Sequence, residues 1–184
     1  MTDSKSDCWT MKLDDETGKS MTLHLFKDVE NTPVILKKLH ANELPCCILK
    51  AALIADPFQV AVAANKAAVA EKLTGLTTKT LYTEILFNLS PSKNISQSLQ
   101  KFGIDDKETN VIVATIHDGS ENPELAQILN EIKGSRLPIS KLNAFTDIQL
   151  IKKTYKLDDS ELEVSNIMDS IVSRISTKDF SSYK

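Results

Sequence analysis

The chain has 184 residues, of which 41% are hydrophobic and 26% charged, a composition that fits one globular domain with a sizeable core and argues against disorder. The net charge of −3 argues against a surface that binds nucleic acid all over, since such modules carry a clear basic excess. We expect a single domain over 1–184 with flexible ends at about 1–7 and 178–184.

Targeting and redox signals are weak. The first residues lack the apolar core of a signal peptide, and the most apolar stretch, 45–69, is interrupted by charged and amide side chains. Cys8, Cys46 and Cys47 are an odd number without the spacing of a zinc site, and the three histidines are scattered. We therefore expect an intracellular protein with no disulfide, no metal and no cofactor.

The first part of the chain predicts a hairpin, a helix and a buried segment. Segments 9–13 and 21–26 alternate in polarity around a turn at Gly18, which favours a β-hairpin. Thr32-Pro33 is typical of a helix start, and a short helix should run to His40. The apolar run 46–55 fits either a strand or a helix; we favour a strand that ends at Ala55.

The rest of the chain is mostly helical in prediction, with one clear strand at 110–116, which is rich in β-branched residues. Capping residues, prolines and glycines predict six further helices, at 57–73 after Asp56, 78–88, 95–102 after Asn94 or Ser96, 122–133, 147–155 and 159–175. Helices outnumber strands and do not alternate with them. The fold class is therefore α+β, with several helices packed on a small, mostly antiparallel sheet.

The sequence contains none of the common catalytic motifs. All five glycines are isolated, so neither a phosphate-binding loop nor a dinucleotide-binding turn is present. It also lacks a serine-nucleophile elbow and a zinc-protease helix motif. We therefore expect a protein that is not an enzyme; an unrecognised site using Glu84 and His117 is the remaining enzymatic alternative.

The helix predicted at 57–73 has an unusual apolar stripe. At about 100° per residue, Asn65 falls in the middle of it, and the other members are Phe58, Val62, Val69 and Leu73. An amide in such a place must find a hydrogen-bond partner. Asn65 either bonds a neighbouring backbone group and fixes the helix, or contacts a ligand, and Lys66 lies next to it at the edge of the stripe.

Positive charge gathers around this helix. Residues 65–101 include five lysines and only two glutamates. Lys72 and Lys79 flank the turn at Gly75, where lysines also oppose the helix dipole. The cluster is either a solvated face or a local anion-binding patch.

The final predicted helix also has a one-sided stripe. Its members are Val164, Ile167, Met168, Ile171 and Ile175. A stripe of this kind is usually core, but a terminal amphipathic helix can give part of its face to a partner protein.

Several segments resemble the PRPK-binding protein family. In the central block they are Ile54-Ala-Asp-Pro-Phe-Gln-Val, Ala63-Ala-Asn-Lys-Ala, Lys79-Thr-Leu-Tyr-Thr-Glu-Ile-Leu-Phe-Asn-Leu-Ser-Pro, Asn94-Ile-Ser and Lys101-Phe-Gly-Ile. Outside it they are Leu25-Phe-Lys-Asp-Val, Lys152-Lys-Thr-Tyr-Lys-Leu and Arg174-Ile-Ser-Thr-Lys-Asp. The resemblance extends over nearly the whole chain.

The resemblance implies a role without catalysis. Members of this family are accessory subunits of the KEOPS/EKC complex that bind its small PRPK-type kinase, while another subunit installs threonylcarbamoyl-adenosine beside the anticodon of tRNA. Some relatives also bind the single-stranded end of tRNA. It implies a protein of the nucleus and cytoplasm with the kinase, the other subunits through the kinase, and tRNA as partners, and no membrane.

Two sets of residues are our candidates for these contacts. For tRNA they are Asn65, Lys66, Lys72 and Lys79, and for the kinase they are Ile171, Arg174 and Ile175. The alternative function is a kinase regulator that acts by protein contacts alone, without RNA binding.

Overall fold

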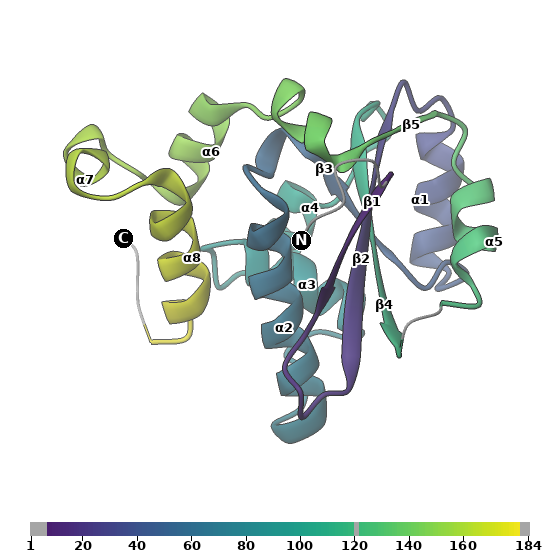
Figure 1. Ribbon diagram of the computed structural model, residues 1–184, viewed down its shortest axis with the longest axis horizontal. Helices are drawn as coiled ribbons and strands as arrows, with labels where there is room; N and C mark the ends of the chain where they lie inside the picture. Colours follow the sequence, from purple (N-terminus) through teal and green to yellow (C-terminus); the bar gives the residue numbers. More distant parts are fainter. Residues whose placement is uncertain (1–6, 120–121, 181–184) are drawn as a thin grey trace.

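The computed structural model describes residues 7–119 and 122–180 (Figure 1). Parts of both ends that we expected to be flexible, 1–6 and 181–184, lie outside the described residues. A five-stranded sheet forms the centre, with strands β1 (Cys8–Lys12), β2 (Lys19–Lys27), β3 (Cys47–Lys50), β4 (Val111–Asp118) and β5 (Ser135–Leu137). Their order is β1-β2-β4-β3, every pairing is antiparallel, and β5 pairs with β2 beyond the end of β1.

Helices cover both faces of this sheet. They are α1 (Thr32–His40), α2 (Pro57–Leu73), α3 (Leu81–Leu89), α4 (Ile95–Phe102), α5 (Leu125–Asn130), α6 (Ile148–Tyr155), α7 (Asp159–Val164) and α8 (Ile167–Thr177), with 3-10 turns at Ala51–Leu53 and Ile139–Ala144. Figure 1 shows α1 and α5 on one side of the sheet and the other helices on the opposite side or beyond it. The chain is thus a single α+β domain, as predicted. None of the described helices has the length and apolar character needed to cross a bilayer.

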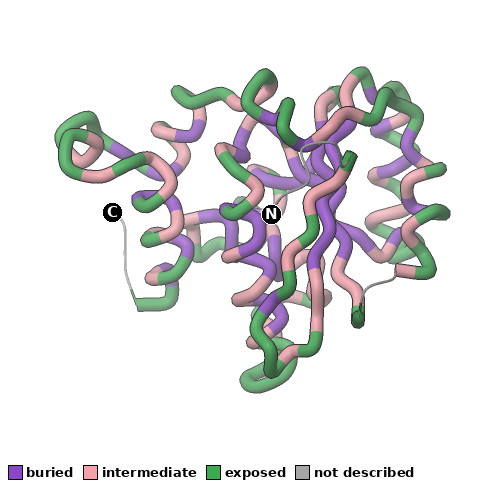
Figure 2. The backbone as a smooth tube through the Cα atoms, viewed as in Figure 1, coloured by how far each residue is buried: buried purple, intermediate pink, exposed green. Residues whose placement is uncertain are grey.

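The alternation of side chains along β2 divides the core into two. Leu23 and Leu25 belong to the larger core, which includes α2, α3, α6 and α8. Phe26 points the other way and belongs to a smaller core under α1 and α5. Figure 2 shows the buried chain running through the sheet between these two layers.

Helix α2 buries a different face from the one that the sequence suggested. Its buried positions are mostly alanines, Ala61, Ala63, Ala64, Ala67 and Ala68. Phe58 and Leu73 of the predicted stripe are 44% and 63% exposed. The helix is apolar on more than one side, and its small residues let it approach the sheet and α3 closely. The large apolar side chains of the predicted stripe therefore did not mark the buried face.

Asp56 and Asn94 cap their helices as predicted, and Asp147 is a further cap that was not predicted from the sequence. Asp56 accepts a hydrogen bond from the Phe58 backbone N–H (2.8 Å), and Asn94 and Asp147 cap α4 and α6 in the same way. After α2, the N–H of Gly75 donates to the Ala70 carbonyl (2.7 Å) with φ at +88°, a left-handed conformation that suits glycine.

Other predicted boundaries were wrong. The strand after α1 ends at Lys50 and continues as a 3-10 turn instead of reaching Ala55. Helix α3 begins at Leu81, and α5 covers only Leu125–Asn130. The helix predicted at 159–175 is two helices, because the side chain of Asn166 caps α8 by accepting from the Asp169 N–H (2.9 Å). Val164, on the far side of this break, is 89% exposed and does not belong to the stripe of α8.

Candidate interaction site

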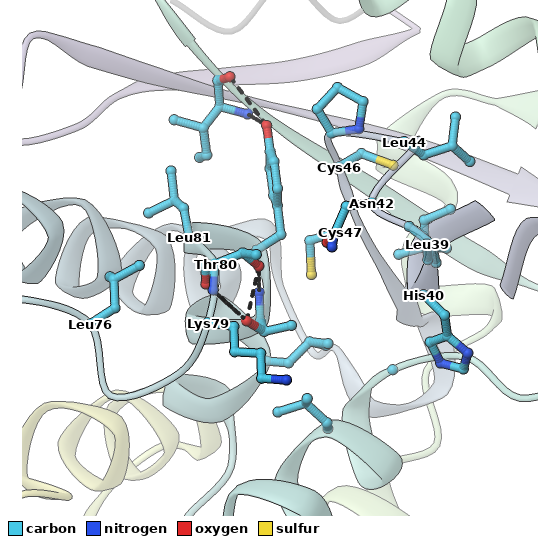
Figure 3. Close-up of a pocket in the computed structure, with 18 of the residues that line it drawn as sticks. Leu39, His40, Asn42, Leu44, Cys46, Cys47, Leu76, Lys79, Thr80 and Leu81 are labelled. Atoms are coloured by element: carbon cyan, nitrogen blue, oxygen red, sulfur yellow. Dashed lines mark hydrogen bonds between the residues drawn. The ribbon is translucent and has the colours of Figure 1, made fainter. Parts of the chain in front are cut away.

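A cavity of about 600 Å³ opens between the end of α1, the start of β3, and helices α3 and α4 (Figure 3). Its wall is largely apolar and includes Leu39, Leu44, Leu76, Leu81, Leu86 and Leu99. A hollow of this size and character suits a small molecule or a few residues or bases of a larger partner.

The start of α3 forms one rigid wall of the cavity. Thr80 and Thr83 make a reciprocal cap, in which the Thr80 hydroxyl accepts from the Thr83 N–H (3.1 Å) and the Thr83 hydroxyl accepts from the Thr80 N–H (3.0 Å). Glu84, which is buried, accepts from both the backbone N–H and the hydroxyl of Thr78, each at 2.7 Å. These bonds hold the turn before α3 against the helix.

Tyr82 spans from this wall to the sheet. Its hydroxyl oxygen lies 3.5 Å from both the backbone nitrogen and the carbonyl oxygen of Ile116 in β4. Burial raises the pKa of Tyr82 to about 12, so the phenol stays protonated at neutral pH.

Charged side chains lie around the cavity. Lys19 lies 3.5 Å from Glu71 and 3.7 Å from Asp118, so its charge is shared with carboxylates. Lys79 is exposed and forms no ion pair with any described residue. His40 at the end of α1 also lines the cavity. The free positive charge of Lys79 favours an anionic ligand.

The two cysteines of the cavity are poor nucleophiles. Burial raises the pKa of Cys46 to about 12, and burial also raises the pKa of Cys47 well above its ordinary range. The thiolate is the reactive form of cysteine, and it is scarce for both at neutral pH. Within 7–119 and 122–180, no three histidine, cysteine or acidic side chains are grouped so that they could hold a metal ion.

Three of the four candidate RNA residues are held by other parts of the protein. Asn65 Oδ1 accepts from the Asp14 backbone N–H (2.7 Å), Lys66 Nζ pairs with Asp179 (2.8 Å), and Lys72 donates to the carbonyl of Glu16. Lys79 alone among the four lines the cavity. Lys79 thus lies at the cavity, whereas Asn65, Lys66 and Lys72 of α2 do not line it. The role of all four residues in RNA binding stays a prediction.

The three candidate kinase residues are mostly inside the protein. Ile171 and Ile175 are 0% and 1% exposed and belong to the larger core. Arg174 makes two hydrogen bonds to the carboxylate of Glu161, both at 2.7 Å, which tie α8 to α7. A direct kinase contact by the two isoleucines would require α8 to move, so this assignment too stays a prediction.

Glu84 and His117 are engaged separately. Glu84 is bonded to Thr78 as described above, whereas His117 Nε2 lies 2.9 Å from the Thr22 hydroxyl and His117 Nδ1 lies 3.1 Å from the Gly119 carbonyl. None of these contacts joins the two side chains, and the arrangement offers no acid–base pair for the enzymatic alternative.

Sequence reasoning missed the cavity itself. Its lining comes mainly from segments 36–48 and 76–104, with Lys19, Glu71 and Ile116 added from elsewhere, and these parts of the chain carry no common motif. One signal was available: Lys79, Tyr82 and Leu86 fall in the block that resembles a known family, although nothing in that block marks them as facing a hollow.

Comparisons with known proteins identify relatives over most of the chain. The family described as Kinase binding protein CGI-121 matches residues 26–179. The EKC/KEOPS complex subunit TPRKB of Danio rerio is 34% identical over 160 residues, covering 87% of this chain and 91% of the relative. The EKC/KEOPS complex subunit CGI121 of Candida glabrata is 31% identical over 147 residues (79% and 83%), and that of Schizosaccharomyces pombe is 30% identical over 162 residues (85% and 92%).

Proposed function

Because the chain belongs to the Kinase binding protein CGI-121 family, we propose that it is a non-catalytic subunit of a KEOPS/EKC complex that binds the PRPK-type kinase. The observation that carries the proposal is the match of residues 26–179 to a kinase-binding family, together with relatives that are named as subunits of this complex. In this role the protein supports threonylcarbamoyl-adenosine formation beside the anticodon of tRNA, in the nucleus and cytoplasm.

We place the kinase contact at the outer surface of α7 and α8. Val164 and Phe180 flank α8 and are 89% and 91% exposed, so their apolar surface is open to a partner. The ion pair between Arg174 and Glu161 holds α7 against α8 and so fixes the relative position of the two helices. Ile171 and Ile175 then act from inside, by packing α8 on the core.

Co-purification with the PRPK-type kinase of the same organism tests this proposal. The paired change V164D and F180D should abolish capture of the kinase while the melting temperature stays near that of the wild type. V34D is the matched control, because Val34 is also an exposed apolar residue (51%) but lies on α1, at the opposite end of the molecule (Figure 1). A folded wild-type protein that fails to capture the kinase would refute the proposed role.

We further propose that the cavity beside Lys79 receives an unpaired end of tRNA. The support is its apolar wall, which can cover a base, next to a lysine without an ion pair that can meet a phosphate. A gel-shift assay should give a complex with tRNA that is competed by an unpaired 3′ single strand. It should not be competed by the same tRNA with that end removed.

The second candidate is a kinase regulator without RNA binding. Lys66 and Lys72 favour it, because both are engaged within the protein, and so does the net charge of −3. If the protein captures the kinase but gives no gel shift with tRNA at low salt, this second candidate is supported, and the proposal that the cavity binds tRNA is refuted.

A further inference from the structure

Lys178 is a buried cation without a buried counter-ion. It follows the last residue of α8 and is 1% exposed. Its Nζ donates a hydrogen bond to the carbonyl of Phe87 and lies 3.2 Å from the centroid of the Phe87 ring. These contacts dock the end of α8 onto α3.

The two carboxylates near Lys178, those of Asp179 and Glu84, are already engaged with other partners. From α2, Lys66 pairs with Asp179 (2.8 Å) and also donates to the Ile175 carbonyl (3.1 Å). From α3, the Glu84 carboxylate accepts two hydrogen bonds from Thr78. Lys93, in the connection after α3, adds a second positive charge nearby. Among the described residues, no carboxylate forms an ion pair with Lys178.

This environment disfavours the ammonium form. Burial removes most of the water that stabilises a charged amine, and one carbonyl with one ring face replaces only part of it. Burial first, and then repulsion from Lys66 and Lys93, lower the pKa of Lys178 from its ordinary value of 10.5 to about 7, although Asp179 and Glu84 act in the opposite direction.

We propose that the C-terminal end of α8 is a pH-sensitive latch. Lys178 docks it on α3, Lys66 holds it to α2, and it opens more readily when the buried Lys178 amine has to take up a proton. The undocked amine is exposed to water and binds a proton more tightly than the docked one. Docking is therefore most favourable above pH 10.5 and weakens as the pH falls toward 7, below which no further loss occurs.

The size of the effect follows from the two pKa values. With one proton taken up on release, the opening constant of the latch rises nearly tenfold for each unit of pH lost between about 10 and about 8, and about fivefold between pH 8 and pH 7. Between pH 9 and pH 7 it rises by roughly 50-fold.

Amide hydrogen exchange at pH 7 and pH 9, corrected for the intrinsic rate of exchange, measures this opening. Amides at the end of α8, 171–177, should be roughly 50-fold better protected at pH 9, while those of β4 keep the same protection at both values. The K178M variant, which keeps an unbranched side chain only one atom shorter and cannot bind a proton, should lose the difference. K153M, at an exposed lysine of α6, is the matched control and should keep it.

Two results would overturn the latch. One is equal protection of α8 at both pH values in the wild-type protein. The other is an equal change of protection in α8 and β4 between the two pH values, which would show that the pH dependence comes from global unfolding. If K178M does not fold, K66M takes its place: removing the neighbouring charge frees Asp179 for Lys178, so the difference between the two pH values should shrink, and an unchanged difference would count against the latch.

Discussion

The hydroxyl of Tyr155 joins three helices by accepting a hydrogen bond from the side-chain amide of Gln59 (3.0 Å) and donating one to the Leu89 carbonyl (2.6 Å). Both Tyr155 and Gln59 are buried. Y155F should lower the free energy of unfolding by about 1–3 kcal/mol, because it leaves the Leu89 carbonyl unpaired. Urea denaturation measures this. Y82F is the control: its hydroxyl contacts are 3.5 Å long, so an equal loss there would contradict the assignment.

His24 should make the protein less stable in mild acid. It is 1% exposed, and no described residue makes a hydrogen bond to its ring nitrogens. Burial, with a smaller effect of nearby Arg136, lowers the pKa of His24 from 6.5 to about 4. The unfolded chain therefore binds the proton more tightly, and stability falls as the pH drops from 6.5 to about 4, by up to about 3 kcal/mol.

Denaturation at pH 7 and pH 4.5 tests this for His24. H24F should remove most of the difference between the two values, because a phenyl ring fills the site without binding a proton. If H24F loses as much stability at pH 4.5 as the wild type does, the acid sensitivity comes from titratable groups other than His24.

Asn65 should contribute to local order and not to RNA affinity. Its amide oxygen holds the backbone of Asp14 in the connection between β1 and β2. N65A should cost about 0.5–1.5 kcal/mol of stability and leave the affinity for tRNA unchanged. Thermal melting and a tRNA titration on the same sample decide this, and a loss of affinity without a loss of stability would instead support the RNA contact predicted from the sequence.

Lys79 should account for part of the salt dependence of RNA binding. If its ammonium neutralises one phosphate of a single strand, K79A should reduce the slope of log affinity against log salt by about 0.7. Titrations at several salt concentrations measure that slope. K153A changes the net charge equally at an exposed site on α6, and the same reduction there would mean that the effect is not local to the cavity.

The parts of the fold that were predicted correctly depend on local chemistry. Asp56 and Asn94 cap their helices through bonds to residues two or three positions away, and such signals are complete within a short segment. The family resemblance also depends on short segments, and it is confirmed. The signal at Asn166, which splits the last helix, is of the same kind and was overlooked.

The parts that were predicted wrongly depend on contacts between distant segments. Phe58 is exposed because the alanines of α2 pack against β2 and α3 instead. A helical wheel shows only the helix itself and cannot show which face its neighbours cover. Likewise, Lys66 looks free in sequence, yet its partner Asp179 is more than a hundred residues away. The cavity combines segments that only the folded chain brings together.

The central place of β4 sets the order in which the chain can fold during its synthesis. β2 and β3 lie on either side of β4, so neither can pair with it until β4 has been made, roughly 80 residues after β2 ends. At about 5–20 residues per second, translation leaves those two apolar strands with open edges for several seconds. Open strand edges are templates for aggregation, so a nascent chain of this protein should depend on chaperones until residue 118 has emerged from the ribosome.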